Sequence, residues 1–184
     1  MDNGASSYRR FLAGDNDALT EIIRDYSDGL TLYLTSIVKN ICIAEELTEE
    51  TFVRLVVKRP KFRGKASFRS WLYTIGRNAA LDCLRKNSRL SDVPVDELYL
   101  PSDEECIEQR AVREEQRIHL RRALNELDNN YSQVLYLKYF GEFSNSEISS
   151  IMDISLRQTE NLLYRAKTTL KNKLEKEGFV YEEL

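Results

Sequence analysis

Apolar residues recur every three or four positions along most of this 184-residue chain, and no segment keeps the strict alternation of a β-strand. The longest run covers residues 19–41 and predicts a helix with one apolar face. Its apolar positions are Leu19, Ile22, Ile23, Tyr26, Leu30, Tyr33, Leu34, Ile37, Val38 and Ile41. Glycine and proline number only seven and three, so tight turns are few. The sequence therefore predicts an all-α fold.

The predicted helices fall into two sets. In the first, Asp15 and Asn16 can cap the long helix, a second helix follows at 44–57, and a third begins near Ser67 after the breakers Pro60 and Gly64. The second set is expected at 106–127, 132–140, 145–152 and 156–176. The intervening "LSDVPVDELYLPSDEE" holds two of the three prolines and many acids, which is typical of a linker.

We therefore predict two small helical domains on one chain. The first covers residues 1–90 and the second covers residues 106–176. A flexible acidic linker at 91–105 joins them, and an acidic tail at 177–184 follows the second.

The net charge of −3 conceals three charged blocks. Residues 58–89 contain ten basic side chains and one acidic side chain, for a net charge of +9. Residues 92–115 contain nine acidic and two basic side chains, and residues 157–176 contain six basic and two acidic ones. Basic blocks on both sides of an acidic spacer favour two contacts with one polyanion.

The composition argues against several classes of protein. No apolar run approaches the ~18 residues that cross a bilayer, and the N-terminus has no apolar stretch typical of a signal peptide. Cys42, Cys83 and Cys106 are odd in number and far apart, which fits neither a disulfide framework nor a metal site. We expect a cytoplasmic protein with reduced thiols, without membrane insertion, cofactor or small-molecule substrate.

The segment "KFRGKASFRSWLY", residues 61–73, interleaves four cations with four aromatic rings around one glycine. Single-stranded nucleic acid needs positive charge for its phosphates and flat faces for its bases, and each stacked base contributes ~1–3 kcal/mol. Gly64 allows a tight loop, and the helix start at Ser67 offers backbone N–H groups. We expect Phe68 and Leu72 in the core, whereas Trp71 fits both a core position and a stacking platform.

Near the C-terminus, "SNSEISSIMDISLRQTENLLYRAKTTLKNKL" predicts a short helix, a three-residue turn at 153–155 and a longer helix. This is the helix-turn-helix layout, whose second helix can lie in the major groove of DNA. An ordinary helical hairpin would give a similar pattern. In the DNA-binding interpretation, the first turns of the second helix meet base edges and later positions meet phosphates. The candidates are Arg157, Gln158 and Asn161 for bases, and Arg165, Lys167 and Lys171 for phosphates.

The order "AEELTEETFVRL…FRGKASFRSWLYTIGRNAALDCLRKNSR", followed by this helix-turn-helix, strongly resembles a bacterial sigma factor of the extracytoplasmic-function (ECF) group. The resemblance extends from about Asn16 to Lys176, with residues 1–90 similar to region two and residues 106–176 similar to region four. It implies an RNA polymerase sigma factor that binds the core enzyme through its clamp helices and flap. It also implies recognition of the −35 and −10 promoter elements and DNA melting for transcription initiation. Such a protein is not an enzyme, and an anti-sigma factor is an expected partner.

The resemblance also implies roles for particular residues. The acidic helix resembles the segment that docks on core polymerase, although family members often carry glutamine where Glu49 stands; its candidates are Glu45, Glu46, Glu49 and Phe52. The next segment resembles the one that captures a base of the −10 element; its candidates are Phe62, Arg63, Gly64, Lys65, Ser67, Trp71, Arg77, Asn78, Asp82, Arg85 and Lys86. The recognition helix departs from the family pattern at Thr159, Glu160, Asn161 and Leu162, so we expect an unusual −35 preference.

Two other classes of function would share parts of this pattern. A free-standing transcriptional regulator would share the helix-turn-helix, but it would bind paired half-sites as a dimer and would leave the basic aromatic segment unexplained. An enzyme acting on nucleic acid would need a metal-binding or acid–base cluster. His119 is the only histidine and has no such cluster in the sequence around it.

Overall fold

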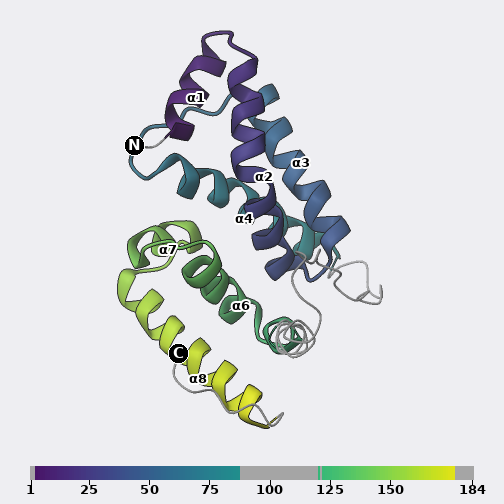
Figure 1. Ribbon diagram of the computed structural model, residues 1–184, viewed down its shortest axis with the longest axis vertical. Coiled ribbons are helices and arrows are strands. Elements are labelled where there is room, and N and C mark those ends of the chain that lie inside the picture. The colour runs from purple at the N-terminus through teal and green to yellow at the C-terminus, as the bar shows by residue number, and fades with distance from the viewer. Residues whose placement is uncertain (1–2, 88–119, 121, 177–184) are drawn as a thin grey trace, which may run out of the picture.

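The computed structural model describes residues 3–87, 120 and 122–176, and every element within them is helical (Figure 1). The prediction of an all-α fold is therefore confirmed. The elements are α1 (Asn3–Leu12), α2 (Asp17–Val38), α3 (Ile41–Lys58), α4 (Phe68–Asn87), α6 (Asn129–Leu135), the π-helical turn η1 (Tyr136–Phe140), α7 (Asn145–Met152) and α8 (Leu156–Lys176). None of these helices is both long and apolar enough to cross a bilayer.

Helices α1–α4 form the amino-terminal module, in which α2 packs against the other three. The predicted apolar face of α2 is largely buried, with Leu30, Leu34 and Ile37 fully covered. Ile23 was expected in this core and is instead exposed. Burial of this face against three helices is the main stabilising contribution to the module.

The boundary between α2 and α3 differs from the prediction. A single helix to Ile41 was expected, but Lys39 adopts a left-handed conformation that ends α2 at Val38. Asn40 then accepts a hydrogen bond from the backbone N–H of Ile43 and caps α3. Helix α2 therefore ends before Ile41, and α3 begins there as a separate helix because the Asn40 side chain satisfies a free backbone N–H in its first turn.

Helix α1 was not predicted. Its residues Tyr8 and Phe11 are buried against the rest of the module. Gly4 is required there, since a Cβ atom at this position would lie 2.4 Å from the ring of Phe68. The close approach allows α1 to pack directly over the start of α4.

Helices α6, η1, α7 and α8 form the carboxyl-terminal module. The predicted helix-turn-helix is confirmed with its predicted bounds, a short helix α7, a turn at 153–155 and the longer α8. Asp153 takes the left-handed conformation that closes α7, and Ser144 with Glu147 forms a capping box at its start. Helix α6 begins at Asn129, three residues before the predicted start, because Asp128 caps it.

Of the predicted helix at 106–127, residues 106–119 and 121 lie outside the described residues, whereas residues 120 and 122–125 are described and are helical. The linker at 91–105, the acidic tail at 177–184, Cys106 and His119 lie outside the described residues.

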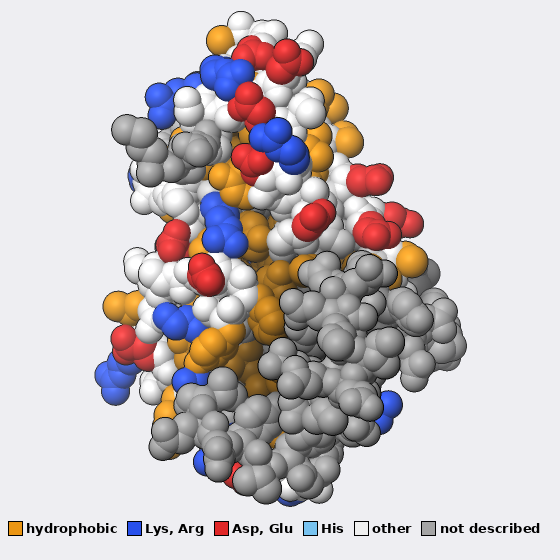
Figure 2. Space-filling model, in the orientation of Figure 1, with side chains coloured by type: hydrophobic (Ala, Val, Ile, Leu, Met, Phe, Trp, Pro, Cys, Tyr) orange, Lys and Arg blue, Asp and Glu red, His pale blue; other side chains and the backbone are white. Residues whose placement is uncertain are grey.

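The two modules pack against each other, which the sequence did not predict. Helix α7 lies against α4, and α6 lies against α2 (Figure 1). Apolar side chains are visible along the junction in the space-filling view (Figure 2). The N-terminal start of α4 and the loop before it are thereby brought next to α7.

Candidate nucleic-acid interface

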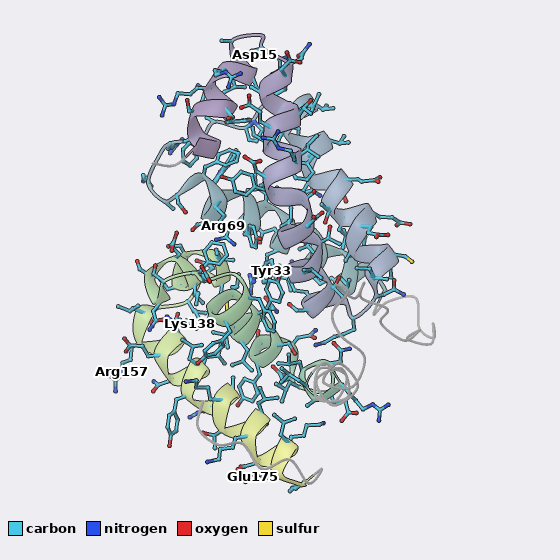
Figure 3. All side chains as sticks on the ribbon, in the orientation of Figure 1. Asp15, Tyr33, Arg69, Lys138, Arg157 and Glu175 are labelled. Atoms are coloured by element: carbon cyan, nitrogen blue, oxygen red, sulfur yellow. The ribbon has the colours of Figure 1, made fainter. Side chains whose placement is uncertain are left out.

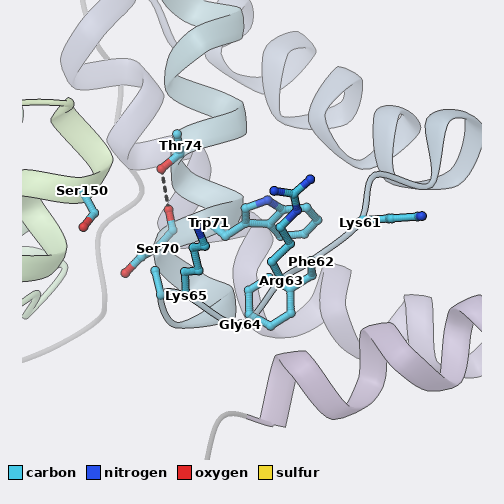
Figure 4. Close-up of a pocket in the computed structure, with 10 residues that line it drawn as sticks. Lys61, Phe62, Arg63, Gly64, Lys65, Ser70, Trp71, Thr74 and Ser150 are labelled. Carbon is cyan, nitrogen blue, oxygen red and sulfur yellow. Dashed lines mark hydrogen bonds between the residues drawn. The ribbon is translucent and has the colours of Figure 1, made fainter.

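The loop between α3 and α4 covers residues 59–67, and its residues 61–66 form one wall of a surface pocket of about 280 Å³ (Figure 4). A second wall comes from Ser70, Trp71 and Thr74 on α4, and Ser150 on α7 contributes to a third. Gly64 turns the loop with a φ of +68°, a conformation that most other residues resist. The cations Arg63 and Lys65 are exposed at the rim. The pocket therefore combines positive charge at its mouth with aromatic surface inside.

The ring of Trp71 belongs to a cluster of aromatic side chains. Its centroid lies 5.3 Å from that of Phe62, 5.5 Å from that of Phe68 and 5.4 Å from that of Tyr8. Phe68 and Leu72 are fully buried, as predicted. Trp71 and Phe62 are only partly buried and line the pocket. Trp71 therefore packs against the aromatic cluster and also lines the pocket, and its role as a stacking platform stays a prediction.

Helix α1 holds the start of this loop in place. The Tyr8 hydroxyl donates a hydrogen bond to the carbonyl oxygen of Pro60 at 2.8 Å, and the Arg59 guanidinium lies 5.5 Å from the ring centroid of Phe11. Burial raises the pKa of Tyr8, while the charge of Arg59 opposes this shift. Tyr8 is therefore a neutral hydrogen-bond donor at physiological pH.

The first turn of α4 is occupied by a carboxylate from the other module. Ser67 Oγ accepts from the backbone N–H of Ser70 at 3.2 Å and thus caps α4. Ser67 Oγ also donates to Glu147 Oε1 at 2.9 Å, and Ser70 Oγ lies 3.2 Å from the same oxygen. Burial disfavours the charge of Glu147, but hydrogen bonds from Ser144, Ser67 and Ser70 outweigh it and lower the pKa of this carboxyl below its usual value. Glu147 is therefore ionised at neutral pH.

The remaining candidates on α4 lie in three environments. Arg77 is half-buried and its Nε donates to Gln133 Oε1 of α6 at 3.0 Å. Asn78 and Lys86 are exposed. Asp82 and Arg85 form an exposed ion pair at 3.1 Å. The structure thus places Asn78 and Lys86 where a ligand can reach them, while Arg77 contacts the second module.

Helix α8 presents an exposed polar face and a buried apolar one. Thr159, Leu163 and Ala166 pack into the module, whereas Arg157, which lies at the edge of the molecule in Figure 3, and Asn161 point outward. The remaining exposed candidates are Gln158, Arg165, Lys167 and Lys171. Lys167 also lies 5.2 Å from the ring centroid of Tyr139, and Lys171 pairs with Glu175 at 3.8 Å.

Gln158 has a structural role that the sequence interpretation missed. Its Oε1 accepts from the backbone N–H of Ser155 at 2.8 Å, and its own N–H donates to Ser155 Oγ. This reciprocal pair is a capping box that begins α8. Gln158 is therefore engaged at the helix start, in contrast to the free outward side chain of a base-reading residue.

Tyr164 was overlooked and lies on the outward face of α8. It is 74% exposed and stands seven residues after Arg157 and three after Asn161, spacings that place all three on one side of a helix. The same spacing could have identified it from sequence. Its ring adds apolar and hydrogen-bonding capacity to this face.

On α3, acidic and apolar side chains share an exposed face. Glu45, Glu46 and Glu49 are exposed, as an interaction site requires, and the exposed Val53, Val56 and Val57 follow them in the next two turns. The spacing of Val56 from Phe52 would fit a core position, but Val56 is 40% exposed. Phe52 is buried, so in this conformation it supports the helix from within.

Within residues 3–87, 120 and 122–176, no group of acidic, histidine or cysteine side chains is arranged to hold a metal ion. A pocket lined by cations and rings on one module, together with a helix-turn-helix on the other, defines a two-module nucleic-acid-binding protein.

Comparison with known proteins assigns this class more closely. Residues 22–90 match the family model described as sigma-70 region 2, and residues 117–170 match that described as sigma-70, region 4. The chain is 30% identical to the ECF RNA polymerase sigma factor SigM of Bacillus subtilis over 83% of its own length and 93% of SigM. It is 28% identical to the RNA polymerase sigma factor YlaC of the same organism, over 87% of this chain and 94% of YlaC.

The fold is also that of a solved sigma factor, RpoE of Bartonella quintana in complex with the anti-sigma factor NepR. The TM-score is 0.71 at 19% identity, with 85% of this chain and 96% of RpoE covered. This chain belongs to the ECF family of RNA polymerase sigma factors. Its function is promoter recognition in transcription initiation, and its partners in that function are core RNA polymerase and promoter DNA.

Proposed function

We propose that the pocket beside the α3–α4 loop holds an unpaired base of the −10 promoter element, while α8 contacts the −35 element as duplex. The observation that carries this proposal is the pocket itself, because rings and cations converge there on a module separate from the helix-turn-helix. Duplex DNA offers no free base faces, whereas an opened strand does. The two sites therefore suit a protein that binds duplex DNA through α8 and stabilises an opened strand in the pocket.

In the pocket, Phe62 and Trp71 supply faces on which a base can stack, at ~1–3 kcal/mol for each stacked base. The exposed cations Arg63 and Lys65 lie beside them and can neutralise the phosphates of the same strand. Asn78 and Lys86 extend this surface along α4. Together these contributions help offset the cost of unpairing.

On α8, we propose that Arg157 and Asn161 read base edges, and that Arg165 and Lys171 contact phosphates. Arginine can bond guanine through two hydrogen bonds, and asparagine suits adenine. The exposed Tyr164 joins this set because it follows Asn161 by three residues and lies on the same face. Gln158 is left out of the base-reading set because it caps the helix.

The exposed face of α3 is our proposed docking site for the clamp helices of core polymerase. Glu45, Glu46 and Glu49 would pair with basic side chains of the polymerase, and Val53 and Val57 would add apolar contact. Electrostatic complementarity of this kind favours fast and specific association. The carboxyl-terminal module would contact the flap.

We propose that the protein is a specificity subunit and not a catalyst, and that it acts in the cytoplasm with the polymerase. We also propose control by an anti-sigma factor. The support is the shared fold with RpoE, whose structure was solved with the anti-sigma factor NepR.

The test of the pocket is Arg63→Ala with Lys65→Ala in reconstituted holoenzyme, on a promoter selected by run-off transcription from a promoter library. The matched control is Arg9→Ala with Arg24→Ala, which removes two exposed cations from other helices of the same module. We expect binding to core polymerase to be unchanged for both double variants. Permanganate reactivity of unpaired thymines should fall about tenfold for the loop variant alone, equivalent to ~1.4 kcal/mol. Unchanged permanganate reactivity in the loop variant would show that the pocket does not hold an unpaired base of the −10 element.

A further inference from the structure

Helix α8 carries an acidic side chain on the face that we assign to promoter DNA. Glu160 is exposed and stands three residues after Arg157 and four before Tyr164. These spacings make the three side chains neighbours on one side of the helix. A carboxylate at this place needs an explanation, because every phosphate of duplex DNA carries a negative charge.

The charge of Glu160 is not balanced by an ion pair. Helix α8 contains two acidic side chains, Glu160 and Glu175, and the second pairs with Lys171 at 3.8 Å. Figure 3 shows Glu175 and Arg157 toward opposite ends of this helix. Within the described part of the chain, Glu160 makes neither an ion pair nor a side-chain hydrogen bond. Its carboxylate oxygens are therefore open to hydrogen bonds from a ligand.

The backbone that carries Glu160 is held in place from within the module. The preceding residue, Thr159, is fully buried, and its hydroxyl donates to the backbone carbonyl oxygen of Ser155 at 3.2 Å. Near the other end of the helix, Lys173 pairs with Glu126. These contacts fix the rotation of α8 in the module and keep Glu160 on its outer face.

The chemistry of the major groove limits what this carboxylate can bind. An ionised carboxylate only accepts hydrogen bonds, and the amino group of cytosine is a donor that glutamate or aspartate can meet. Adenine also offers an amino group, but its N7 acceptor lies beside that group and would repel the second carboxylate oxygen.

The position of Glu160 along the helix suits contact with a base. The first turns of a recognition helix meet base edges. Each helical residue rises ~1.5 Å, so Glu160 lies about 4.5 Å beyond Arg157 along the axis. This distance is close to the ~3.4 Å between successive base pairs. The two side chains can therefore contact neighbouring base pairs.

We infer that Glu160 is a specificity-determining residue, which accepts a hydrogen bond from a cytosine of the −35 element close to the base pair that Arg157 contacts. The inference rests on the proposed contact of α8 with this element. The carboxylate gains a hydrogen bond only where a cytosine amino group faces it, and it repels the phosphates of every sequence alike. Glu160 therefore lowers non-specific affinity and raises discrimination.

The test uses reconstituted holoenzyme and the promoter selected by run-off transcription from a promoter library. Every single base-pair substitution is made in the −35 element of this promoter, and the affinity for each duplex is measured by competition. The variants are Glu160→Ala and Glu160→Gln. The matched control is Glu175→Gln, which removes the other negative charge of α8. Both glutamates are exposed, so none of these changes reaches the core.

For wild type, we expect one cytosine whose replacement weakens binding about tenfold. Glu160→Ala should abolish this preference, leave the other positions unchanged, and bind duplexes that lack the cytosine more tightly than wild type does. Glu160→Gln should move the preference at the same position toward adenine, because glutamine pairs with N6 and N7 of that base. Glu175→Gln should leave every base preference as in wild type.

A uniform effect would overturn the inference. If Glu160→Ala raises the affinity for every duplex by the same factor, the carboxylate only repels DNA and reads no base. Loss of a preference for a base other than cytosine would overturn it as well.

Arg165→Ala separates this result from failure of the proposed function, because a phosphate contact should weaken binding to every duplex equally. If Arg165→Ala has this effect while Glu160→Ala relaxes no position, only the inference about Glu160 is wrong. If Arg157→Ala, Arg165→Ala and Glu160→Ala all leave binding to the whole series unchanged, α8 does not contact the −35 element, and the proposed function fails with it.

Discussion

Tyr8 links helix α1 to the α3–α4 loop, and its hydroxyl can be removed without changing the packing of its ring. The residue is 1% exposed, and its ring lies 5.5 Å from that of Phe68 and 5.4 Å from that of Trp71. Its hydroxyl donates to the Pro60 carbonyl at 2.8 Å. Tyr8→Phe therefore deletes one hydrogen bond, whereas Tyr8→Ala deletes the bond and the ring.

The two substitutions should differ in magnitude. Loss of a partly buried hydrogen bond costs ~0.5–1.5 kcal/mol, so we expect Tyr8→Phe to lower the free energy of unfolding by about 1 kcal/mol. Removal of a fully buried aromatic ring costs ~3–5 kcal/mol, which is the range expected for Tyr8→Ala. With a urea dependence of ~2 kcal/mol per molar, the Tyr8→Phe midpoint should fall by about 0.5 M.

The assay uses a probe that the protein already contains. Trp71 is the only tryptophan, and it contacts the Tyr8 ring, so its fluorescence during urea unfolding reports directly on this cluster. The control is Tyr164→Phe on α8, which removes a hydroxyl from a side chain that is 74% exposed and should leave the midpoint unchanged. A Tyr8→Phe midpoint equal to that of wild type would show that the Pro60 hydrogen bond contributes no stability, and the proposed anchoring of the loop would be refuted.

Two further predictions concern Lys39 and Arg157. Burial lowers the pKa of Lys39 from 10.5 to about 8, against the opposing charge of Asp128, so the folded state favours the neutral amine. The contribution of Lys39 to the free energy of unfolding is therefore complete above pH 10.5 and is lost as the pH falls through about 8. Lys39→Met should flatten this part of the dependence of unfolding free energy on pH, as measured by urea titrations. An identical pH dependence for the two proteins would contradict the prediction. Arg157→Ala should weaken binding by ~1–3 kcal/mol at one base pair of the −35 element, measured by competition among substituted duplexes, and an equal loss on every duplex would make Arg157 a phosphate contact.

The fold could be predicted from the sequence wherever a long apolar periodicity coincided with a local turn or cap. The helix-turn-helix is the clearest case, because Asp153 and the Ser144 capping box fix both ends of α7. Helix α1 was missed because only Tyr8, Phe11 and Leu12 in Asn3–Leu12 are large and apolar, and its packing depends on the absent side chain of Gly4. The spacing of apolar residues along the chain does not predict such a close approach between Gly4 and Phe68.

The capping role of Gln158 was missed because local hydrogen bonding was not considered. Ser155 and Gln158 have the spacing of a capping box, so this hydrogen bond could have been predicted from the sequence. Val56 shows that apolar spacing alone does not predict burial. Its spacing fits the core, but a helix packed on one side buries only part of a wide apolar arc, and the remainder stays exposed. That exposed remainder belongs to the face of α3 that we propose as a docking site.

The contact between the modules could not be predicted, because its side chains meet across long sequence separations. Ser67 and Glu147 are 80 residues apart, and Tyr33 and Gln133 are 100 apart. These polar contacts follow no period, and each adds only ~1 kcal/mol net. The buried apolar side chains of the two modules form one continuous cluster across the junction. Apolar periodicity along the chain predicts that each helix has a buried face, but it does not tell which distant helix covers that face.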